Sequence, residues 1–167
     1  MNKLAKPTRQ GHVAGQVTFL VGVADDENSL TAARFAALRA ANSGGRVALI
    51  HVVKPPDFQH WEAVSDLMRA ETQEEAEIIL NTVAKEVKAI NGQQPLIYVR
   101  EGLIGEQVLA QIEEDISINL LVVGAAAPNT GKGSLISWLS GQLVGKLHIP
   151  LVIVPGNLTD NQLRDLT

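Results

Sequence analysis

Five short runs of mostly apolar residues, separated by longer amphipathic segments, form the pattern of this chain. The runs lie at residues 17–23, 46–53, 96–100, 120–123 and 151–154. Consecutive rather than alternating apolar residues are typical of strands that are covered on both faces in a parallel sheet. The sequence therefore predicts five buried parallel strands.

Between these runs, apolar residues recur at helical spacing. In the segment 29–42, the residues expected to face the core are Leu30, Ala33, Ala37, Leu38 and Ala41. Another helix is predicted at 105–114, and a longer one ends at residue 90; the segment 58–68 forms either its first turns or a separate short helix. Strands that alternate with helices predict a doubly wound α/β sheet with right-handed crossovers.

Length and composition indicate one globular domain. The chain has 167 residues, 46% of them hydrophobic, and a formal net charge of −4. We expect a flexible leader at residues 1–15, one domain at 16–156 and a C-terminal tail at 157–167.

The same composition argues against several classes of function. The chain has no cysteine, which excludes disulfides and thiolate chemistry and favours a reducing cytoplasm. No run reaches the roughly 18 apolar residues of a membrane span. The mildly acidic balance argues against nucleic acid as a partner, because phosphate backbones are bound by clustered Lys and Arg.

Candidate chemistry lies where the predicted strands end, since open α/β sheets bind ligands beyond the carboxyl ends of their strands. Gly124 opens the loop after the fourth run, and Asp25 follows the first run, where its carboxylate can accept a hydrogen bond from a ligand hydroxyl. For Asp26 and Glu27, capping of the next helix and interaction with its dipole in the first turn is the favoured interpretation. Asn28 or Ser29 can cap that helix.

His51 lies in the second predicted strand. A lone histidine on a buried strand is more often a satisfied core side chain than a catalyst or ligand, so we expect the former.

The chain resembles the universal stress protein family over nearly its whole length. The resemblance consists of VGVAD at 21–25, ALIHVV at 48–53, REG at 100–102, LLVVG at 120–124 and IPLVIVP at 149–155, in the order and spacing of that family. It implies a Rossmann-like sheet, as in adenine nucleotide alpha hydrolases, with strand order 3-2-1-4-5 and helices on both faces. It also implies a homodimer paired through the last strands and, in one branch of the family, ATP bound between strands 1 and 4.

The nucleotide-binding branch carries G-x-x-G, followed nine residues later by G and then Ser or Thr, and this sequence departs from that pattern. Gly124 keeps the first position, but Ala127, Ser137 and Trp138 occupy the others. A Cβ hinders the close approach of a phosphate to backbone N–H groups. Any ATP or AMP is therefore expected to bind weakly.

The loop still contains groups suited to an anion. Residues 130–134, Thr-Gly-Lys-Gly-Ser, place the cation of Lys132 and the hydroxyl of Ser134 between flexible positions. The segment is not a P-loop, because Ala126 stands where the first glycine is required. A turn that merely connects two elements is an equally good interpretation.

The family resemblance adds three residues to this candidate site. It places Val52 against the adenine, Asp25 near the ribose or adjoining groups, and Ser140 near the phosphates.

We therefore expect a dimeric module of stress response or signalling with a weak adenine-nucleotide site. The alternative is a dimeric, partner-binding stress protein that binds no nucleotide. A nucleotide hydrolase is less favoured, because Asp25, His51 and Ser134 lie in three separate elements and form no convincing pair of nucleophile and base. We predict no catalytic residue and no metal ligand.

Overall fold

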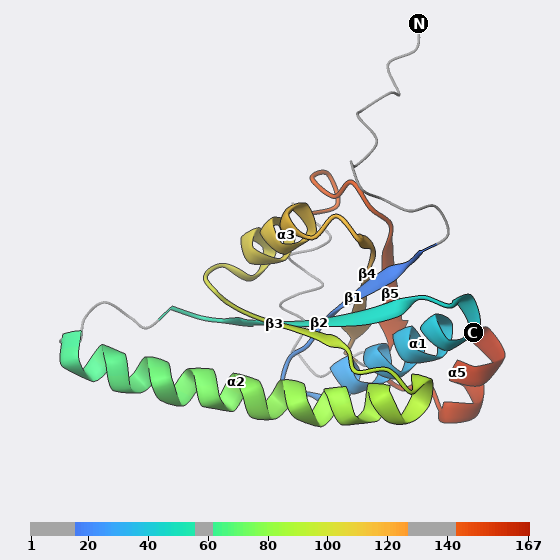
Figure 1. The fold of residues 1–167 in the computed structure, drawn as a ribbon, viewed down its shortest axis with the longest axis horizontal. Helices are drawn as coiled ribbons and strands as arrows, with labels where there is room; N and C mark the ends of the chain where they lie inside the picture. Colours follow the sequence, from blue (N-terminus) through green and yellow to red (C-terminus); the bar gives the residue numbers. More distant parts are fainter. Residues whose placement is uncertain (1–15, 56–61, 127–142) are drawn as a thin grey trace, which may run out of the picture.

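A computed structural model describes residues 16–55, 62–126 and 143–167. Within them, five parallel strands form one sheet in the order β3-β2-β1-β4-β5 (Figure 1). The predicted fold class and strand order are confirmed. The strands are β1 (Thr18–Gly22), β2 (Arg46–Val53), β3 (Leu96–Glu101), β4 (Ile118–Ala125) and β5 (Leu151–Pro155).

The prediction placed β4 too narrowly, at 120–123. The strand begins earlier because Ile118 pairs with Thr18, after which the register shifts by one residue. Asn119 occupies this irregularity, and its side-chain oxygen accepts a hydrogen bond from the Thr18 N–H at 3.1 Å. A polar residue thus continues the strand by supplying an acceptor from its side chain.

The sheet lies between two helical layers. Helices α1 (Glu27–Ser43) and α2 (Glu62–Asn91) cover one face, and α3 (Ile104–Glu114) lies against the other (Figure 1). The central strand β1 is buried on both sides: Val21 packs with α1 and α2, whereas Leu20 packs with α3, and both side chains are 0% exposed. This double burial explains the consecutive apolar residues of the sequence.

Helix α1 packs through small side chains, which lets it approach the sheet closely. Its buried alanines are Ala32, Ala33, Ala36, Ala37 and Ala40. Ala41, expected in the core, is exposed. That expectation was wrong because the buried stripe is centred on Ala33 and Ala36, so position 41 turns away from the sheet.

Helix α2 is one continuous element, so residues 62–68 form its first turns and not a separate helix, whereas residues 58–61 lie outside the described residues. It spans 30 residues, and its tightly packed part begins at Ala76, which is 1% exposed. Between residues 66 and 75, every residue except the half-buried Thr72 is exposed.

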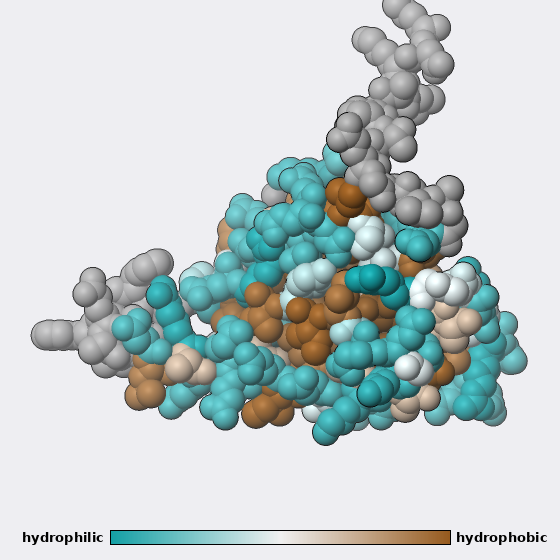
Figure 2. All heavy atoms as spheres, viewed as in Figure 1, coloured by the Kyte–Doolittle hydropathy of each residue, from teal (hydrophilic) through white to brown (hydrophobic). Residues whose placement is uncertain are grey.

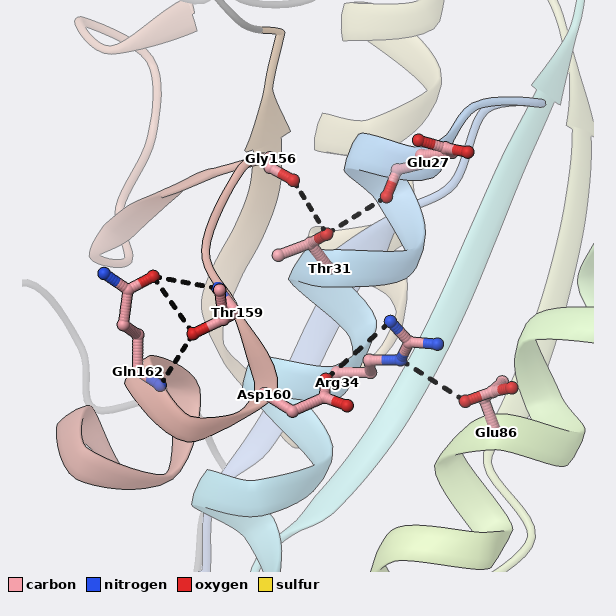
Figure 3. Close-up of polar contacts among 8 residues, drawn as sticks. All are labelled: Glu27, Thr31, Arg34, Glu86, Gly156, Thr159, Asp160 and Gln162. Carbon is pink, nitrogen blue, oxygen red and sulfur yellow. Dashed lines mark hydrogen bonds and ion pairs between the residues drawn. The ribbon is translucent and has the colours of Figure 1, made fainter.

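A further helix, α5 (Asp160–Leu166), follows β5 in the segment that the sequence analysis described only as a tail. Thr159 and Gln162 form a capping box at its start: the Thr159 hydroxyl accepts from the Gln162 N–H at 3.3 Å, and the Gln162 side chain accepts from the Thr159 N–H at 2.9 Å (Figure 3). Leu163 is 1% exposed and packs in the α1–α2 core. Helix α5 is therefore part of the folded domain.

Polar contacts join α5 and the end of β5 to α1 (Figure 3). Arg34 lies between Glu86 of α2, at 3.3 Å, and Asp160 of α5, at 3.9 Å. The Thr31 hydroxyl lies 3.2 Å from the carbonyl oxygen of Gly156 and within the same distance of the Glu27 carbonyl. Because the Arg34 ion pairs are partly exposed, we expect each to stabilise the fold by less than about 1 kcal/mol.

Candidate functional site

The candidate site lies at the carboxyl ends of β1 and β4, which are neighbours in the sheet, with Val21 opposite Val122. In the sheet, β1 lies between β2 and β4, so the strand order runs from β1 to β3 on one side and from β4 to β5 on the other. Such a switch point leaves a crevice that ligands occupy in open α/β sheets.

The N-terminus of α1 borders this crevice and is held by two side-chain caps. Asp26 is the N-cap residue, and its side chain accepts from the Ser29 N–H at 2.7 Å. The Ser29 hydroxyl in turn accepts from the Ala24 N–H at 2.9 Å. Of the residues proposed for capping, the structure selects Asp26, with Ser29 as its partner.

Asp25 is left outside this cap. Its residue is exposed, and no hydrogen bond to its carboxylate occurs within the part of the chain that the structure describes. Both oxygens of the Asp25 carboxylate are therefore open to hydrogen bonds from elsewhere, whereas Oδ1 of the adjacent Asp26 is already used by the cap.

Gly124 is required by packing. A Cβ at this position would lie 2.5 Å from the carbonyl carbon of Asn28 and closer still to its carbonyl oxygen. A Cβ on Gly156, just beyond β5, would meet the Asn28 side chain and lie 2.8 Å from the Ala125 carbonyl oxygen. Asn28 is thus held between the ends of β4 and β5, a role that the sequence analysis missed. Glycines at the ends of two predicted strands were its only signal.

Val52 lies near the end of β2 and is half-buried against the cluster formed with α3. It supplies an apolar surface on that face of the sheet. His51, one residue earlier, places its Nδ1 atom 2.8 Å from the Val23 carbonyl oxygen. Because a carbonyl only accepts, Nδ1–H donates, and His51 is the satisfied side chain that we expected.

Four predicted site residues, Ala127, Lys132, Ser134 and Ser140, lie outside the described residues. The other three predicted site residues lie at or near the carboxyl ends of neighbouring strands: Asp25 after β1, Val52 in β2 and Gly124 in β4. The proposed phosphate contacts stay sequence-based predictions.

Other ionisable groups with displaced pKa values lie on the edge strand β3 and at the C-terminal end of α3. Burial and a 2.8 Å hydrogen bond to Asp115 raise the pKa of Tyr98 to about 12. Burial alone would raise the pKa of Asp115, but hydrogen bonds from Ser117 and Tyr98 outweigh it and lower that pKa. The hydrogen bond from Arg100, at 2.8 Å, lowers the pKa of Glu114. These contacts join β3 to α3 and its C-terminal end.

Within the described ranges, no group of three or more His, Asp or Glu side chains could hold a metal ion. A search of the helices in those ranges found none long and apolar enough to cross a membrane.

The fold and this edge define the class: a doubly wound α/β protein with a potential ligand crevice at the β1/β4 switch point. The particular family follows from comparison with known sequences. The chain belongs to the universal stress protein family, whose model matches residues 18–155. None of the curated proteins compared with the chain matches it significantly.

Solved structures agree with this family. The universal stress protein UspA from Lactobacillus plantarum has a TM-score of 0.68 at 16% identity, covering 83% of this chain and 97% of that one. A universal stress protein from Archaeoglobus fulgidus in complex with dAMP scores 0.60 at 13% identity, covering 83% and 97%. One from Arabidopsis thaliana with AMP bound scores 0.58 at 15% identity, covering 83% and 91%. At these identities the likeness supports the fold. Helix α5 lies beyond the end of the family match.

Proposed function

We propose that this protein is a module of stress response or signalling that binds an adenine nucleotide weakly at the carboxyl ends of β1 and β4. The observation that carries the proposal is the Asp25 carboxylate, which is exposed beside this crevice while Asp26 caps α1. The structures with dAMP and AMP give the ligand class. We propose binding rather than catalysis, and a cytoplasmic location consistent with the absence of cysteine.

Weak affinity follows from the altered loop sequence. Ala127 and Ser137 replace glycines, and Trp138 replaces a hydroxyl residue. A hydrogen bond to a charged group contributes roughly 1.5–3 kcal/mol, so loss of two such bonds would weaken a micromolar binder to about millimolar. Submicromolar ATP affinity by calorimetry would contradict this step.

Asp25→Ala tests the nucleoside end of the site. Since the variant removes an acceptor for ligand hydroxyls, it should weaken adenosine and AMP by the same factor, roughly tenfold. Asp165→Ala is a matched control, because Asp165 is also exposed and acidic but lies on α5. Equal affinities of adenosine for the Asp25 variant and the unmodified protein would remove Asp25 from the site.

Lys132→Ala tests the phosphate end. Because Lys132 is the only cation between residues 124 and 134, its loss should weaken AMP, ADP and ATP but not adenosine, and the effect should shrink as salt is added. Unchanged nucleotide affinity at low ionic strength would identify the loop as a connector.

The second candidate is a dimeric stress protein that binds a partner but no nucleotide, and the three loop replacements favour it. The two candidates differ in what the protein carries after purification without added ligand. Chromatography of the denatured sample should detect ATP, ADP or AMP if the site is used in the cell, and consistent absence together with no AMP binding in vitro would favour the second candidate.

In either case we propose a homodimer through β5. This strand is at the end of the sheet order, and Ile153 is 48% exposed on it. The Leu121 N–H donates to the Pro150 carbonyl and the Gly156 N–H donates to the Ala125 carbonyl. In a parallel ladder, the backbone groups of alternate residues bond to the same neighbouring strand. The backbone N–H of Val152 therefore faces β4, and the backbone N–H of Ile153 faces the open edge.

This alternation gives a sharp test. Ile153→Pro removes an outward N–H and should yield a folded monomer in light scattering, because proline is tolerated on a sheet edge. Val152→Pro removes a bond within the protomer and should instead destabilise the fold. A dimeric Ile153→Pro variant would exclude pairing through this strand.

A further inference from the structure

The turns of α2 at residues 66–75 have little of the core packing that would hold them in place. From residue 66 to residue 75 only Thr72 is even half-buried, and Leu67 and Met68 are 64% and 44% exposed. A helical stretch of this length is marginal in water without tertiary packing. A group that fills the space between these turns and the sheet would stabilise them.

The structure contains such a space, a cavity of about 300 Å³ between α2 and the carboxyl ends of β2 and β3. Figure 2 shows apolar surface between α2 and α3, where the edge strand β3 lies. Val53 and Val99 give the cavity apolar walls on the sheet side, and both are half-buried. Met68 and Thr72 line it from α2. Its volume is at the lower end of the range for small-molecule pockets.

The cavity also has a cationic side. Lys54 and Arg69 belong to its lining, together with Glu101. The Arg69 guanidinium and the Glu101 carboxylate are 3.8 Å apart, and their side chains are 50% and 44% exposed. An ion pair this long and this exposed is worth well under 1 kcal/mol, so Arg69 can exchange it for a ligand anion at little cost. Arg100 also lines the cavity, but its guanidinium is hydrogen-bonded to Gln107, Gln111 and Glu114 of α3. Lys54 and Arg69 are therefore the two cations available beside Glu101, and the lining suits a monoanion better than a phosphate dianion.

This cavity is separate from the candidate nucleotide site. Val52 packs in the cluster with α3, whereas Val53, the next residue of β2, lines the cavity under α2. Successive residues of a strand point to opposite faces, so Val52 and Val53 lie on different faces of the sheet. The cavity is also at β2 and β3, whereas the candidate nucleotide site is at the ends of β1 and β4.

We propose that the cavity binds a small amphiphilic carboxylate, with its apolar chain against Val53, Val99 and Met68 and its carboxylate on Arg69 and Lys54. Arginine binds a carboxylate through two parallel N–H···O hydrogen bonds, which a neutral end group cannot reproduce. A bound ligand would fill the space under residues 66–75 of α2. The inference does not depend on nucleotide binding, because the two sites share no residue.

The test uses decanoate, below its micellar concentration, and decanol as its uncharged analogue. We expect saturable, one-to-one binding of both in an NMR titration, with shifts at the amides of Thr72 and Val99. Thr72→Trp should abolish binding of both, because the indole fills the cavity. Among the described residues, the threonine hydroxyl bonds only to its own helix, at the Met68 carbonyl, so its loss should not unfold the chain.

Arg69→Gln separates the charged contact from the apolar one. It should weaken decanoate roughly tenfold and leave decanol unchanged. Lys88→Gln, which removes one charge from the exposed far end of the same helix, is the matched control and should change neither. The proposal is overturned if neither probe binds saturably, if Thr72→Trp binds decanoate as the unmodified protein does, or if Arg69→Gln and Lys88→Gln have equal effects.

Discussion

Replacing Gly124 with alanine should destabilise the protein in the absence of any ligand. The added Cβ would lie 2.5 Å from the carbonyl carbon of Asn28, and the carbonyl oxygen is nearer still. These are backbone atoms in the first turn of α1, so no side-chain rotation can relieve the contact. Either the end of β4 or the start of α1 must move.

The expected magnitude follows from this geometry. Overpacking of a well-packed interior typically costs 1–3 kcal/mol, and a backbone obstruction places Gly124→Ala near the upper end, at about 2–3 kcal/mol. For a chain of this size, that corresponds to a decrease in Tm of roughly 5–10 °C. If the glycine served only to admit a phosphate, the free energy of unfolding without ligand would change by less than about 0.5 kcal/mol.

Urea unfolding followed by circular dichroism measures this difference directly. Gly145→Ala is the matched control, because a Cβ there meets nothing within 4 Å. We expect the control to lie within about 0.5 kcal/mol of the unmodified protein. Equal stability of the Gly124 and Gly145 variants would refute the packing explanation.

Three further predictions concern stability and titration. Leu163→Ala should lower the free energy of unfolding by about 2 kcal/mol or more in urea, since this side chain is 1% exposed; no change would mean that α5 adds nothing to the core. Tyr98 is the only tyrosine, so its ultraviolet titration should have a midpoint near 12, and Asp115→Asn should move that midpoint toward 10. The stability that this tyrosine contributes is full below pH 10 and is lost as the pH rises through the pKa of the folded state. Arg100→Gln should raise the pKa of Glu114, measured by NMR, because it removes the hydrogen bond that lowers that pKa. The stabilisation from Glu114 is present above its unfolded pKa and is lost as the pH falls through the pKa of the folded state. If the free energy of unfolding of the variant fell with acid pH as that of the unmodified protein does, this assignment would be contradicted.

Most of the sheet could be predicted because its strands are buried on both faces and therefore apolar at successive positions. Prediction failed where a contact from elsewhere in the chain replaced that signal. The start of β4 was missed because Asn119 uses its side chain to satisfy the Thr18 N–H. Helix α5 was missed because Leu163 is its only buried residue. Its capping box, Thr159 to Gln162, was the local signal available.

The candidate site was predictable to a similar degree. A residue that follows a central strand must lie at the carboxyl edge of the sheet, so Asp25 and Gly124 could be placed from strand order alone. The division of roles between Asp25 and Asp26 could not, because it depends on which carboxylate reaches the Ser29 N–H. Nor could the sequence reveal that Asn28 packs between Gly124 and Gly156, since that contact joins three distant segments.

The measurement that tests the central claim most directly is an NMR titration of the unmodified protein with adenosine and then with AMP. The account predicts saturable shifts at the amides of Asp25, Val52 and Gly124 for both ligands, with dissociation constants of about millimolar. Absence of saturable shifts, or shifts confined to residues away from the carboxyl ends of β1 and β4, would contradict it.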